Sequence, residues 1–146
     1  MTRDMNWKKF FIAFVAAFVF IFLFGFVWYG VLMNPIHHEV PTLFRPEAEF
    51  RNYFAWLVLG HLVMAFFLTL LCARYTPGGG AASAARLGFM TALIYTGADF
   101  ITYAVQPLTT KMLAGWIAGD LLMFAIAGAI IGAIYKPGPI TSGASL

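Results

Sequence analysis

Charged residues are scarce in this chain, and their scarcity is the first constraint on its class. Only 10% of the 146 residues are Asp, Glu, Lys or Arg, whereas 62% are hydrophobic. A typical soluble globular domain carries about 25% charged residues. This composition excludes an ordinary soluble domain, and we expect an integral membrane protein that forms one domain over residues 1–146.

Cysteine and catalytic motifs are also lacking. The single Cys72 has no partner for a disulfide within the chain. The sequence contains no HExxH motif and no arrangement of a nucleophile with a histidine, so hydrolase chemistry has no support. The nine basic residues are dispersed rather than gathered in a patch, which argues against nucleic-acid binding. No cofactor is implied by the sequence.

Long apolar stretches are what the chain does contain. A hydrocarbon core about 30 Å thick is crossed by roughly 20 helical residues. Four stretches reach that length, at about residues 10–33, 53–73, 87–105 and 112–135. We therefore predict an all-α fold, a four-transmembrane-helix bundle with short connections. The lipid bilayer is its first partner.

The distribution of basic residues predicts the orientation of the bundle. One side of a four-span protein would hold Arg3, Lys8, Lys9, Arg74, Arg86 and Lys136, and the other Arg45, Arg51 and Lys111. The side richer in Lys and Arg normally faces the cytoplasm. We expect both termini in the cytoplasm and the bundle in a bacterial inner membrane.

The third apolar stretch carries a polar stripe. On a helix from Gly88 to Gln106, a single face would present Thr91, Tyr95, Asp99 and Thr102. A charged Asp inside a bilayer costs on the order of 3 kcal/mol, so Asp99 needs polar neighbours in the protein interior.

Two further ionisable residues lie at a similar depth. Counted from the outer helix ends at 1.5 Å per residue, His61, Asp99 and Asp120 lie about 12, 9 and 12 Å deep. We expect them to form one intramembrane cluster with Tyr95 and Thr102. Three interpretations fit this cluster: a hydrogen-bond network that fixes helix order, a site for a cation or a proton relay, and a site for a polar lipid or quinone headgroup.

The connection between the first two stretches contains a possible metal site. His37, His38 and Glu39 follow one another, and imidazole and carboxylate groups bind zinc, iron or copper. Adjacent residues on a solvated loop also occur without any metal.

The last stretch has the pattern of a packing helix. Gly115 and Gly119 form one GxxxG pair, and Gly128 and Gly132 form a second about 140 to 180° around the helix. The first stretch has eight phenylalanines on all sides, which would face either lipid or another subunit.

Three motifs in the chain resemble a group of known families. LGFMTALIYTGADF is followed about twenty residues later by WIAGDLLM and then by GAIIGAIY. This pattern is similar to uncharacterised bacterial families of small four-helix membrane proteins, classed as domains of unknown function. Asp99 and Asp120 match the two aspartates of one such family, and FVWYG resembles the end of the first helix in another. The resemblance implies this architecture and a membrane location, but no activity.

These patterns lead to one functional expectation and one alternative. We expect a small non-catalytic accessory or scaffolding subunit that associates with other membrane protein subunits, or with a second copy, through the first helix and the glycine faces of the fourth. The alternative is a cation- or proton-linked transporter or binding protein that uses the His61, Asp99 and Asp120 cluster.

Overall fold

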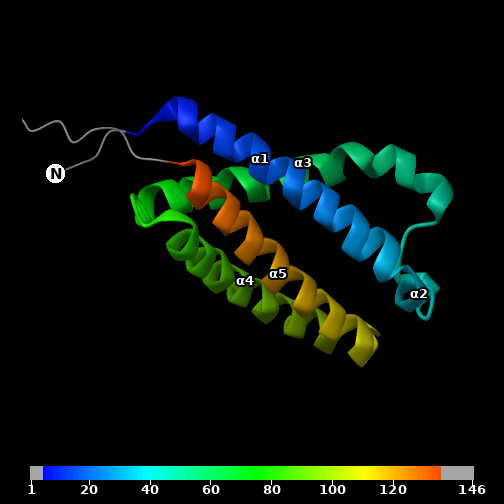
Figure 1. The fold of residues 1–146 in the computed structure, drawn as a ribbon. Helices are drawn as coiled ribbons and strands as arrows, with labels where there is room; N and C mark the ends of the chain where they lie inside the picture. Colours follow the sequence, from blue (N-terminus) through cyan, green and yellow to red (C-terminus); the bar gives the residue numbers. More distant parts are fainter. Residues whose placement is uncertain (1–4, 136–146) are drawn as a thin grey trace, which may run out of the picture.

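The computed structural model describes residues 5–135, and this part of the chain is helical without any strand (Figure 1). The helices are α1 (Trp7–Gly25), its π-helical continuation η1 (Phe26–Leu32), α2 (Asn34–His37), the 3-10 turn η2 (Pro41–Leu43), α3 (Glu47–Tyr75), α4 (Gly80–Val105) and α5 (Thr110–Ile134). The all-α prediction is confirmed.

Three segments of the described chain are long and apolar enough to cross a membrane. They are Trp7–Leu32, Glu47–Tyr75 and Thr110–Ile134, which correspond to the first, second and fourth expected spans. The third expected span lies in α4, a helix of 26 residues. Its Thr, Tyr and Gly residues and Asp99 lower its hydropathy, and α4 is not among the three. Its passage through a membrane stays a prediction, as does the side on which the termini lie.

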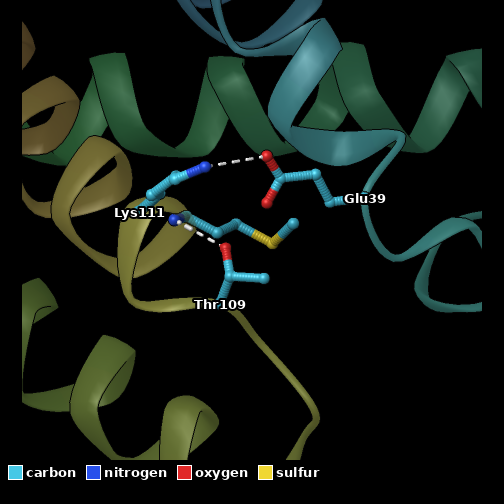
Figure 2. Close-up of polar contacts among 4 residues, drawn as sticks. Glu39, Thr109 and Lys111 are labelled. Carbon is cyan, nitrogen blue, oxygen red and sulfur yellow. Dashed lines mark hydrogen bonds and ion pairs between the residues drawn. The ribbon is translucent and has the colours of Figure 1, made fainter.

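Local sequence explains where the helices begin. Asn6 accepts a hydrogen bond from the Lys9 amide at 3.1 Å, and Thr109 accepts one from the Met112 amide at 3.2 Å (Figure 2). Each side chain caps an amide that has no partner within the helix. α3 begins directly after Pro46 and carries Glu47 and Glu49 in its first turn, where acidic groups complement the helix dipole.

α4 and α5 form the closest helix pair. A methyl group added at Gly88 would fall on the backbone carbonyl of Phe124, and one added at Gly128 would fall on that of Ala84. At the same end of the pair, a methyl group on Gly132 would lie 2.5 Å from the Gly80 carbonyl oxygen. The two backbones touch because these positions have no side chain, which is how small residues promote helix association in lipid.

α1 packs through one narrow stripe. Its buried residues recur every three or four positions: Phe10, Ala13, Ala17, Ile21 and Gly25. Phe10 and Phe14 meet the ring of Phe66 on α3 edge to face, with ring centroids 5.5 and 5.8 Å apart. The phenylalanines of α1 therefore divide between contacts with α3 and exposed positions such as Phe11 and Phe26.

α3 has its buried residues in its C-terminal half. Ala65, Leu68, Thr69 and Cys72 are buried there. By contrast, every residue from Glu47 to Leu57 is exposed. Figure 1 shows the reason: toward its N-terminal end, α3 leaves the α4–α5 pair and extends away from it.

Candidate functional site

The polar centre of the bundle is built by η1 and α5. In η1 each backbone amide donates to the carbonyl group five residues earlier, as in the 2.9 Å hydrogen bond from the Met33 amide to the Trp28 carbonyl. More residues fit in such a turn than in an α-helical turn, so adjacent side chains diverge less around the axis. Trp28 and Tyr29 both reach α5 as a result.

Both side chains donate hydrogen bonds to α5. Trp28 Nε1 donates to the Gly115 carbonyl at 3.0 Å, and the Tyr29 hydroxyl donates to Asp120 Oδ1 at 2.6 Å. The short Tyr29–Asp120 distance is typical of a hydrogen bond to a carboxylate. Asp120 therefore has the polar neighbour that its place in an apolar helix requires.

Gly119 provides the space for these two bonds. A methyl group at this position would lie 2.5 Å from Trp28 Nε1 and 2.7 Å from the Tyr29 hydroxyl oxygen. At Gly115 an added methyl group would collide with the Met33 sulfur atom. The structure thus places the first GxxxG pair against η1 and Met33, and the second pair against α4.

Asp99 lies at the α4–α5 seam without a donor. Its Oδ2 atom is buried and has no hydrogen-bond partner among the described residues. The nearby Thr102 hydroxyl is engaged elsewhere, because it donates to the Ala98 carbonyl at 2.9 Å. The Tyr95 ring packs against Phe124, with centroids 5.0 Å apart. The expected hydrogen-bond network around Asp99 is therefore not formed within residues 5–135.

His61 does not join the carboxylates, contrary to the expected three-residue cluster. Its Nδ1 atom lies 2.7 Å from the Leu57 carbonyl oxygen of its own helix, and its ring packs against Phe22 at 5.4 Å. Its Nε2 atom would lie 2.9 Å from a methyl group on Gly25. His61 faces α1 because α3 crosses α1 at this point. The polar neighbour of Asp120 is Tyr29 instead of His61.

His37, His38 and Glu39 are not arranged as metal ligands. Trp116 Nε1 donates to His37 Nε2 at 3.4 Å, and the His37 ring packs on Phe44 at 4.5 Å. Within residues 5–135, no three His, Cys, Asp or Glu side chains gather as a metal site would require.

Glu39 instead forms an ion pair with Lys111. The Lys111 Nζ atom lies 3.2 Å from Glu39 Oε1, and Figure 2 shows the pair bridging the segment after α2 and the start of α5. The two side chains are 71% and 40% exposed, so the pair contributes little to stability. Its effect is to hold the α2 segment over the end of α5.

The contacts of Trp28, Tyr29 and Trp116 were not predicted from the sequence, because aromatic residues near the ends of a span are typical of the membrane interface. The Tyr29–Asp120 contact could have been found from depth in the membrane. Tyr29 is the one tyrosine of the first helix, and it lies only about 6 Å from the expected end of its span. No pattern in FVWYGVL marks the π-helical turn that directs Tyr29 toward Asp120.

No family model, no curated protein and no solved structure matches this chain.

Acidification is expected to loosen the contact between α2 and α5. Partial burial, and then the proximity of His38, lower the pKa of His37 below its ordinary value of about 6.5. The folded state therefore disfavours the protonated form, so stability present above pH 6.5 is lost as the pH falls below that value. The imidazolium also cannot accept the Trp116 hydrogen bond.

Tryptophan fluorescence in micelles checks this expectation. The pH-dependent change in Trp116 emission should disappear in His37→Phe, which keeps a ring on Phe44, and should persist in the neighbouring His38→Phe. An unchanged profile in His37→Phe would assign the transition to another group.

Proposed function

We propose that the chain is a non-catalytic accessory subunit of a larger membrane complex. The exposed N-terminal part of α3 carries this proposal. From Glu47 to Leu57 every residue is exposed, although Phe54 contacts the Phe22 ring of α1 at 6.2 Å, and this segment presents Phe50, Phe54 and Trp56. Helices associate in lipid through close packing and polar contacts. A partner helix would supply packing that the chain itself does not provide.

One part of the docking surface expected from the sequence, the glycine faces of the fourth span, is used within the chain. The two GxxxG faces of α5 are occupied within the chain, by η1 and by α4. They therefore cannot receive a partner unless the bundle opens. The exposed segment of α3 takes their place, because its aromatic residues Phe50, Phe54 and Trp56 are exposed and it extends away from the α4–α5 pair.

We further propose that α4 is a fourth span and that both termini are cytoplasmic. α4 meets α5 at Gly80 and Gly132 near one end. Near the other end, the hydroxyl groups of Tyr103 and Thr110 lie 3.3 Å apart. A helix that follows α5 over this length shares its depth in the membrane. Reporter fusions at the loops around residues 40, 78 and 107 test this topology in an inner membrane.

Purification from native membranes in mild detergent tests the accessory role. We expect a complex larger than 16.1 kDa in which a second polypeptide is present at a fixed ratio. The double variant Phe50→Ala, Trp56→Ala should lose most of that polypeptide. Phe11→Ala is the matched control, because Phe11 is similarly exposed but lies at the other end of the bundle. A lone monomer in native membranes would refute the proposal.

A second candidate function is cation or proton transfer, which the Tyr29–Asp120 contact favours. A hydroxyl group that donates at 2.6 Å to a half-buried carboxylate is a possible proton path. Reconstitution in vesicles tests this candidate. Asp120→Asn should abolish any proton or cation flux. Asp99→Asn then shows how much of that flux depends on the second carboxylate. Absence of flux in the unsubstituted chain would eliminate this candidate.

A further inference from the structure

We propose that Asp99 is the polar anchor for a partner transmembrane helix that carries a lysine or arginine in the outer half of the bilayer. This inference rests on the proposed accessory function and names the chemistry of the partner. Its basis is an unsatisfied carboxylate: the Oδ2 atom of Asp99 is buried, and no hydrogen bond within residues 5–135 involves either carboxyl oxygen.

The position of Asp99 makes this lack of a partner costly. Asp99 lies six residues before the end of α4 at Val105, which is about 9 Å along the helix axis. The neighbouring residues Phe100 and Ile101 are 57% and 68% exposed and apolar, as expected of a surface in lipid. An ionisable group at such a depth is normally paired with another group of the membrane protein.

The chain itself offers no cation to Asp99. In the described part, all Lys and Arg residues lie in connecting segments or in the first or last two turns of a helix: Lys8, Lys9, Arg45, Arg51, Arg74, Arg86 and Lys111. Arg86, the basic residue of α4, is 13 positions from Asp99, or about 20 Å along the helix. Lys111 is paired with Glu39, and Arg45 stacks on Tyr53 at 3.6 Å.

Charge complementarity indicates that the partner of Asp99 is a different protein and not a second copy of this chain. A second copy would bring another Asp99 and no intramembrane cation from its described helices, and its His61 would face its own α1. A lysine or arginine in a foreign membrane helix has the reciprocal requirement, because it also needs an opposite charge in lipid. Asp99 is only partly buried, so part of its side chain lies at the surface of the bundle.

Cross-linking in native membranes identifies the helix that meets Asp99. A benzophenone amino acid replaces Tyr95, which lies one helical turn from Asp99 and is 40% exposed. We expect the cross-linked peptide to come from a membrane span with a Lys or Arg within two turns of the attachment point. A peptide without a basic residue, a peptide of this same chain other than the α5 segment around Phe124 that Tyr95 already contacts, or adducts with lipid alone would each overturn the inference.

Substitution then tests whether the charge pair holds the complex. Asp99→Leu should reduce the co-purified partner at least tenfold, Asp99→Glu should retain it, and Ile101→Ala should have no effect. Replacing the partner's basic residue with Leu should restore binding to Asp99→Leu, because an apolar pair can substitute for a buried ion pair. A complex that survives Asp99→Leu overturns this inference but leaves the accessory function standing, whereas a lone monomer overturns both.

Discussion

Gly88→Ala is expected to destabilise the bundle strongly. The new methyl group would fall on the Phe124 carbonyl oxygen, which belongs to the backbone of α5 and cannot rotate away. The two helices would have to separate. Overpacking of this kind typically costs about 1–3 kcal/mol, and a contact with backbone belongs at the upper end of that range.

Gly97→Ala is the matched control on the same helix. Nothing lies within 4 Å of the added methyl group there, so only the change in helix propensity remains. That change favours alanine by roughly 0.5–1 kcal/mol. Unfolding by SDS in mixed micelles, followed by circular dichroism, should give opposite shifts for the two variants. Equal shifts would mean that α4 and α5 do not touch at Gly88.

The contact between α4 and α5 and the helix ends are the parts of the fold that the sequence predicts best. Gly128 and Gly132 are spaced one turn apart, and small residues at that spacing are typical of close helix contacts. Pro46 and the glutamates after it likewise mark the start of α3. Each of these signals is local to one helix, so it can be read without knowledge of the neighbouring helices.

The sequence cannot specify which helix faces meet. Lipid is as apolar as the protein core, so hydrophobicity does not distinguish a buried position from an exposed one. Ala17 is fully buried while Phe26 is 64% exposed. The sequence predicts a similar depth for His61 and Asp120, but depth does not give direction. The crossing of α3 over α1 turns His61 toward Gly25, and the π-helical turn brings Tyr29 to Asp120 instead.

The same limit applies to the uncovered segment of α3. From Tyr53 to Leu57 its residues are as apolar as those in the C-terminal half of α3, which is packed. The angle at which α3 extends away from the α4–α5 pair leaves Glu47 to Leu57 exposed. That angle depends on contacts between rings, such as the 6.2 Å contact of Phe22 with Phe54, which no single-helix pattern encodes.

Tyr29→Phe is expected to have the second large effect, because it removes one hydroxyl group and leaves the packing of the ring unchanged. Asp120 Oδ1 would lose the donor that now lies 2.6 Å away. Hydrogen bonds to charged groups contribute about 1.5–3 kcal/mol, and an acceptor left half-buried in an apolar bundle has no water to replace the donor. The free energy of unfolding in micelles should fall by about that amount.

Tyr103→Phe separates the effect of this bond from a general effect of losing a tyrosine hydroxyl group. The Tyr103 hydroxyl lies 3.3 Å from Thr110 at an exposed position, where water can take the place of either partner. We expect a change below about 0.5 kcal/mol for this control. A double-mutant cycle of Tyr29→Phe with Asp120→Leu then isolates the pairwise energy. A coupling energy near zero would show that the Tyr29–Asp120 bond does not hold η1 on α5, and that the Trp28 bond to the Gly115 carbonyl and the packing over Gly119 are sufficient.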